Sequence, residues 1–86
     1  MKTYRLVIST PLGNAFDGDV IFLSVRGVEG DLAVMAGHVP FITAVRPSTC
    51  KIILEDDSER LGELDSGLLT VGEGEVTLLS DSFRWQ

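Results

Sequence analysis

His38 is the one histidine of the sequence and the first candidate for chemistry. An imidazole can serve as a general base, a proton shuttle or a metal ligand, and each role requires a second group placed to work with it. The Gly-x-Ser-x-Gly spacing of a hydrolase nucleophile does not occur, and Ser66 has no glycine two positions before it. We therefore expect His38 not to be catalytic, but to bond to nearby backbone through its ring or to face a partner.

The sequence also lacks the motifs of phosphate-binding loops and of metal-binding loops. Three glycines lie between residues 27 and 37, but neither G-x-G-x-x-G nor G-x-x-x-x-G-K-[ST] occurs there. The acidic run at residues 55–59 lacks the spaced carboxylates of a calcium loop and is typical of a solvated turn. A biotinyl or lipoyl carrier needs a lysine at a hairpin tip, whereas Lys2 lies near the N-terminus and Lys51 in a predicted strand. We expect no cofactor and no metal.

Two acidic residues, Glu29 and Asp31, flank Gly30 in a glycine-rich stretch that predicts an exposed loop. Two like charges this close repel each other unless a cationic surface meets them. The pattern therefore leaves two interpretations open: a solvated turn, or a docking point for a basic surface.

Composition excludes several classes of partner. The 86 residues form one small domain and carry seven basic and thirteen acidic side chains, a net charge of −6. A negative protein repels a phosphate backbone, so nucleic acid is not expected as a partner. The lone Cys50 excludes an internal disulfide, fits a reducing compartment and is predicted to be buried and inert.

No stretch of the sequence predicts membrane insertion. The longest apolar stretch, Val20 to Val25, is far shorter than the ~20 residues that cross a bilayer. Residues 1–13 contain too short an apolar core for a signal peptide. If the protein works at a membrane, we expect another subunit to hold it there.

The elements that must position these residues are all strands, because no window shows a convincing helical period. Short alternating runs are separated by turn residues, with turns at residues 13–14 and 17–18 and a tight corner at residues 37–40. The pattern predicts an all-β fold of eight to ten short strands, either a two-sheet sandwich or a small barrel. The predicted strands cover residues 4–9, 15–16, 19–26, 32–35, 41–45, 50–54, 60–65, 68–71 and 76–79.

Two apolar segments bear on where the core lies. In the strand at residues 19–26, alternation places Val20 and Leu23 on opposite faces, both of them apolar, so this strand is central or its second face meets a partner. In a second segment, four apolar residues flank His38, and we expect most of them in the core and one or two in an interface. These four are Met35, Val39, Phe41 and Ile42.

Four blocks of sequence follow one another in a recognisable order. They are Thr10-Pro11-Leu12-Gly13 with Phe16-Asp17-Gly18, then residues 27–47, then residues 66–71, then residues 76–81. The second block runs glycine, acid, glycine, acid, apolar triplet, Gly-His-x-Pro and Thr-Ala, and resembles the signature of the epsilon subunit of F-type ATP synthases. Gly-His-x-Pro alone is a weak signal, whereas four blocks in register are a strong one. The resemblance covers nearly the whole chain and selects the N-terminal β-sandwich domain of that family.

This resemblance implies a single epsilon-like domain over residues 1–86. It implies a non-catalytic rotor subunit of a proton-translocating ATP synthase, peripheral on the cytoplasmic face of the membrane, that joins the c-ring to the gamma-like shaft subunit during ATP synthesis. The residues implied to meet the ring are Glu29, Gly30 and Asp31. The residues implied to lie toward the shaft are Thr10, His38 and Thr43.

Family members of full length continue into two antiparallel helices that inhibit ATP hydrolysis and in some members bind ATP. The sequence ends at Gln86, where those helices would begin, so we carry over neither role. Two other classes stay open: an unrelated β-sandwich module that recognises a peptide or carbohydrate through exposed aromatic loop residues, and a small hydrolase with a nucleophile near His38.

Overall fold

The computed structural model describes residues 2–86, and over that range it contains nine strands and no helix. The all-β prediction is therefore confirmed. The strands are β1 (Tyr4–Thr10), β2 (Gly13–Gly27), β3 (Gly30–Val34), β4 (Phe41–Val45), β5 (Ser48–Leu54), β6 (Glu59–Leu64), β7 (Gly67–Val71), β8 (Glu75–Ser80) and β9 (Phe83–Trp85).

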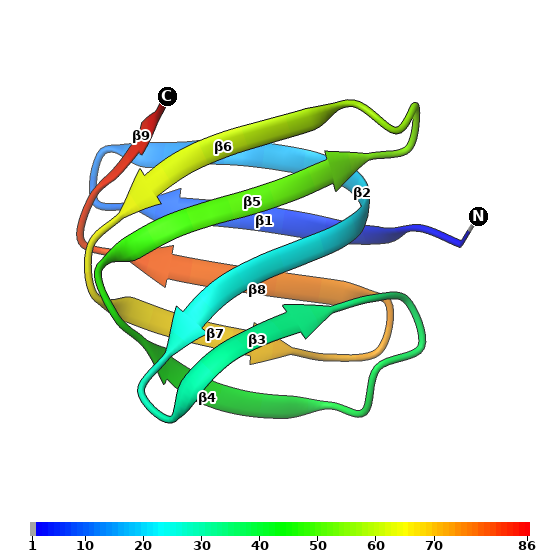
Figure 1. The fold of residues 1–86 in the computed structure, drawn as a ribbon, viewed down its shortest axis with the longest axis horizontal. Helices are drawn as coiled ribbons and strands as arrows, with labels where there is room; N and C mark the ends of the chain where they lie inside the picture. Colours follow the sequence, from blue (N-terminus) through cyan, green and yellow to red (C-terminus); the bar gives the residue numbers. More distant parts are fainter. Residues whose placement is uncertain (1) are drawn as a thin grey trace.

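The strands form two layers that share one long strand, β2 (Figure 1). Sheet I contains β4, β7, β8 and β1, and the first half of β2 pairs with β1. Sheet II contains β5, β6 and β9, with the second half of β2 between β3 and β5. Since β2 pairs with four other strands, the prediction that this segment is central is confirmed.

A bulge in β2 lets the strand change sheets. The pairing register with β5 shifts between Val20 and Phe22, and both Val20 and Leu23 are fully buried. The prediction that these two side chains lie on opposite faces was wrong, because an extra residue in a strand reverses the alternation beyond it. Both side chains therefore reach the same core, from the two halves of a bent strand.

The predicted turn at residues 17–18 was also wrong, since this segment continues the β1–β2 hairpin. Asp17 lies opposite Val7, and the Arg5 guanidinium donates to the Asp17 carboxylate at 2.8 and 2.9 Å. Gly18 lies opposite Leu6 in the same ladder. Hydrogen bonds offered by β1 outweigh the local turn preference of Asp-Gly, because strand formation depends strongly on neighbouring strands.

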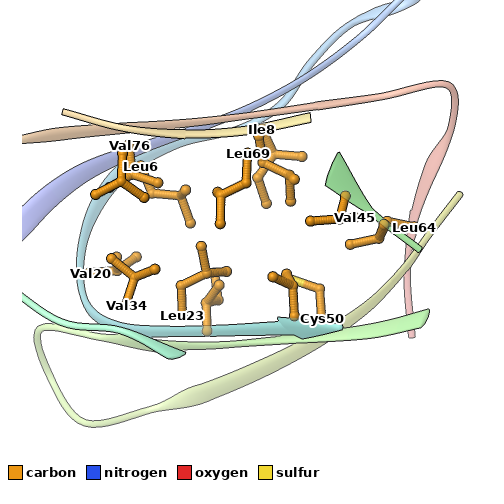
Figure 2. Close-up of a cluster of buried hydrophobic side chains, with 14 of the residues drawn as sticks. Leu6, Ile8, Val20, Leu23, Val34, Val45, Cys50, Leu64, Leu69 and Val76 are labelled. Carbon is orange, nitrogen blue, oxygen red and sulfur yellow. The ribbon is translucent and has the colours of Figure 1, made fainter. Parts of the chain in front are cut away.

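The core fills the space between the two sheets. Figure 2 shows Leu6, Ile8, Leu69 and Val76 of sheet I facing Val20, Val34, Leu23 and Cys50 of sheet II. As predicted, Cys50 is buried, and its desolvation raises the pKa of the thiol to about 12. A thiol that keeps its proton is a poor nucleophile.

The C-terminal strand β9 closes one side of the sandwich and lies beyond the last strand predicted from the sequence, at residues 76–79. β9 pairs with β6, and the Trp85 ring lies edge-on to Phe16 of β2 with centroids 6.0 Å apart. The Trp85 indole N–H points to the Ala15 carbonyl at 3.4 Å, and the Arg60 guanidinium lies 3.7 Å from the Trp85 ring centroid. Trp85 therefore covers part of the first half of β2, at Ala15 and Phe16.

Candidate docking surfaces

The outer face of sheet II is charged, and its charges are paired across neighbouring strands. Arg26 of β2 contacts Asp31 of β3 at 2.9 Å. Two further pairs join adjacent strands, Lys51 to Glu59 at 3.6 Å and Arg84 to Glu63 at 2.6 Å. Such exposed pairs contribute little to stability, but they suit a surface that stays in water.

The outer face of sheet I has a different composition. Two rows of side chains cross β4, β7, β8 and β1 in register, and within these four strands neither row contains a charge. One row is Ala44, Leu68, Leu79 and Ser9, and the other is Ile42, Thr70, Thr77 and Val7. We call these eight residues the uncharged face.

Three large side chains make the uncharged face apolar at its centre and at the β4 edge. Ile42 is 66% exposed, Leu79 46% and Leu68 41%. Single apolar residues scattered over a surface are common and need no explanation. Exposed apolar residues that share one face, as these three do, are typical of an interaction site.

The expectation that most of the apolar residues near His38 are core residues was wrong. Met35, Val39 and Ile42 are all more than half exposed, and only Phe41 packs partly against the core. The reason is that β3 and β4 lie at the edges of their sheets, and the 35–40 connection between them runs outside the two layers.

The residues assigned to the ring lie at the tip of the β2–β3 hairpin. Gly27 and Gly30 are opposite each other, so Val28 and Glu29 form a two-residue turn. Gly30 has a φ of 130°, which favours glycine there. The cation that meets Asp31 within this chain is Arg26, while Glu29 projects into solvent.

Thr43, which was assigned to the shaft, lies beside the ring set rather than apart from it. A groove at the sandwich edge between β3 and β4 is lined by Gly27, Asp31, Leu32, Phe41 and Thr43, among others. The structure therefore brings one shaft residue and the acidic hairpin into one groove.

His38 lies in the connection from β3 to β4, at the opposite end of the sandwich from the hairpin tips of β1–β2 and β2–β3 (Figure 1). Its ring Nδ1 is 3.0 Å from the Val39 carbonyl, and its ring lies 5.1 Å from Phe41. This agrees with the expected bond to local backbone. No other described polar side chain is recorded in a hydrogen bond with the ring.

Thr10 shapes the β1–β2 turn. Its hydroxyl donates to the Gly13 carbonyl at 3.0 Å and accepts from the Leu12 N–H at 3.2 Å. Leu12 at the tip is fully exposed. Thr10 also borders a shallow groove with Leu68 and Leu79, so it lies beside the uncharged face, whereas His38 does not.

The sequence matches one known family over almost its whole length. The family model described as "ATP synthase, Delta/Epsilon chain, beta-sandwich domain" matches residues 3–86. The chain belongs to this family. The resemblance inferred from four sequence blocks, and the sandwich it selected, are therefore confirmed.

A curated relative of this epsilon-type domain is the "ATP synthase epsilon chain, sodium ion specific" of Acetobacterium woodii. The two are 38% identical over 84 residues, which cover 98% of this chain and 63% of the relative. The chain thus spans less than two thirds of the relative's length. No helix long and apolar enough to cross a membrane occurs in residues 2–86.

Two solved structures share the fold at lower identity. A chain of the Euglena gracilis mitochondrial ATP synthase structure matches with a TM-score of 0.91 at 18% identity, over 96% of this chain and 53% of that one. A chain of the Tetrahymena thermophila mitochondrial ATP synthase central stalk and c-ring structure matches with a TM-score of 0.75 at 15% identity, over 92% and 63%.

Membership of this epsilon-type family agrees with the expectation of a non-catalytic chain, because epsilon chains are structural and regulatory subunits of ATP synthase. In residues 2–86, no group of three His, Cys, Asp or Glu side chains is placed to hold a metal ion.

The aromatic side chains bear on the competing class, a β-sandwich module that binds peptides or carbohydrates. All six are buried or half-buried, which disfavours binding through exposed aromatic loop residues.

The sequence analysis did not identify Leu68 and Leu79 of the uncharged face as candidate docking residues. A signal was present, because the pairs Leu68-Leu69 and Leu78-Leu79 place leucine on both faces of β7 and β8. Residues 19–26 also have two apolar faces, and there the strand is central. In β7 and β8 the second apolar face remains exposed.

Proposed function

We propose that this chain is a rotor subunit of a proton-translocating F-type ATP synthase. In this role residues 1–86 act as a single epsilon-like domain that joins the c-ring to the gamma-like shaft subunit. The observation that carries the proposal is the family match over residues 3–86. The domain would be peripheral, on the cytoplasmic face of the membrane, and held there by its partners.

The uncharged face supports this role as the surface for the shaft. Two rows without charge, with Ile42, Leu68 and Leu79 exposed, allow close contact without burying an unpaired charge. Of the shaft residues inferred from the sequence, Thr10 lies beside this face. Thr43 lies opposite the buried Leu69, on the other face of β4, and lines the groove beside the acidic hairpin. We infer that Leu68 and Leu79 belong to the same contact.

The β2–β3 hairpin supports the role as the surface for the ring. Glu29, Gly30 and Asp31 lie at a protruding tip, and the chain as a whole is acidic. A ring surface that carries basic residues would complement this tip and would steer the encounter.

Torque transfer requires a stiff body between the two surfaces. The core side chains are fully buried between hydrogen-bonded sheets, and β2 runs through both layers. A close-packed interior deforms little under load, since it has low compressibility. The domain needs no reacting group for this task.

Binding to a purified shaft subunit and to a purified c-ring tests the proposal. We expect Leu68→Glu to weaken shaft binding at least tenfold, because it buries a carboxylate in an uncharged contact. Thr49→Glu is the control, since Thr49 is exposed on the outer face of sheet II. If Leu68→Glu and Thr49→Glu weakened shaft binding equally, the uncharged face would not be part of the shaft contact.

For the ring, we expect Asp31→Lys to weaken binding about two- to tenfold, with the larger loss at low salt. Glu63→Lys is a matched control, because Glu63 is also an exposed strand residue paired with an arginine. If Asp31→Lys binds as well as the parent chain at every salt concentration, Asp31 is not in the contact. If the parent chain binds neither subunit, the rotor role is refuted.

A further inference from the structure

Three strands of the described chain have a side that is wholly or largely free. β3 and β9 each pair with one strand, whereas β4 pairs with β7 and meets β2 only at its C-terminal end, where Val45 lies opposite Gly27. The three strands differ in how the free side is protected. Exposed edges are normally protected by charge, proline, a bulge or very short length. β3 carries Asp31, and β9 has three residues with Arg84 at its centre. β4, with the sequence Phe-Ile-Thr-Ala-Val, has none of these features within its five residues.

The hydrogen bonds at the end of β4 show which of its groups face outward. The Val28 N–H donates to the Ala44 carbonyl at 3.2 Å from the side opposite β7. Because backbone groups alternate in direction along a strand, Ile42 points to the same side as Ala44, and Phe41 and Thr43 point to β7. The Ile42 N–H and C=O therefore face the free part of this side, whereas the backbone of Val28 lies beside Ala44.

A groove accompanies this free edge. It lies between β4 and β3, and Leu32 and Phe41, both half-buried, form part of its floor. Glu29 and Asp31 stand at its rim. Side chains of a strand added to β4 would meet Leu32 and Phe41 on one face and Ile42 on the other.

We propose that β4 accepts an extended segment of a partner protein as an additional strand. The segment would alternate apolar with polar residues and would carry a lysine or arginine at the end that reaches Glu29 and Asp31. Main-chain bonds to the Ile42 N–H and C=O would supply the register, and the groove would select the apolar side chain. A second copy of this chain suits the site less well, because its net charge of −6 opposes self-association.

The free backbone of β4 supports this proposal without the rotor role, although the site shares Ile42 with the uncharged face and Glu29 and Asp31 with the ring contact. It predicts recognition through main-chain groups. An interface made only by side chains would leave the outward Ile42 amide open to water.

Amide hydrogen exchange of the ¹⁵N-labelled chain tests the proposal. The probe is a soluble ten-residue peptide in which valine alternates with threonine or lysine, used at up to about 1 mM. At ten times its dissociation constant, the peptide should slow exchange of the Ile42 amide about tenfold. The Thr43 amide, which already faces β7, serves as the internal reference.

A peptide N-methylated at alternate residues, which cannot pair, should produce no slowing. Ile42→Pro should abolish binding, because it removes an outward N–H while leaving the β4–β7 ladder complete; the dispersion of its spectrum reports that it is folded. Three results would overturn the proposal: no slowing at saturation, equal slowing by the N-methylated peptide, or slowing caused by raising the concentration of the chain alone, which would indicate a second copy instead.

Discussion

Leu78 and Leu79 are neighbours in β8, and replacing each by alanine tests the assignment of inside and outside for sheet I. Leu78 is fully buried and lies between Leu69 of β7 and Ile8 of β1, whereas Leu79 is 46% exposed on the uncharged face. Leu78→Ala removes buried surface and leaves an enclosed cavity, and should lower the free energy of unfolding by about 2–5 kcal/mol. Leu79→Ala loses only about half of a leucine's burial and leaves no enclosed cavity, and should cost about 1 kcal/mol.

Urea unfolding followed by Trp85 fluorescence and by circular dichroism measures both values. In a domain of this size, each kcal/mol shifts the melting temperature by about 4–8 °C, so the two variants should differ clearly in thermal unfolding as well. A slip of one residue in the β7–β8 register would exchange the two leucines between core and solvent. Equal losses, or a larger loss for Leu79→Ala, would therefore refute the register and with it the uncharged face.

Two further predictions concern buried polar groups. Tyr4→Phe should lower the free energy of unfolding by about 1–2 kcal/mol in urea titrations, because the Tyr4 hydroxyl donates to the Val34 carbonyl at 2.7 Å and the carbonyl would lose its partner; no change would contradict that bond. Burial raises the pKa of Cys50 from 9.0 to about 12. Between these two pH values the folded chain keeps a proton that the unfolded chain releases. The free energy of unfolding should therefore fall as the pH rises from about 9 to about 12. Cys50→Ala should reduce that slope, and a slope that is unchanged would show that Cys50 does not contribute to it.

The candidate site was only partly visible in the sequence. The acidic hairpin and the local bond of His38 followed from residue types and turn chemistry, which act over a few residues. The uncharged face did not, because Ile42, Leu68 and Leu79 come from three strands whose register is set by long-range pairing. The position of Thr43 beside Asp31 likewise depends on how β3 and β4 approach each other.

The sequence by itself determined the fold class, most strand positions and the family, because alternation and turn residues act locally and the four family blocks can be read along the chain. Only the tertiary structure decided which apolar residues are exposed. The bulge in β2 reversed its alternation, β1 drew residues 17–18 into a strand, and the edge positions of β3 and β4 left Met35, Val39 and Ile42 in solvent. The physical reason is that a strand acquires an inside and an outside only when other strands pack against it.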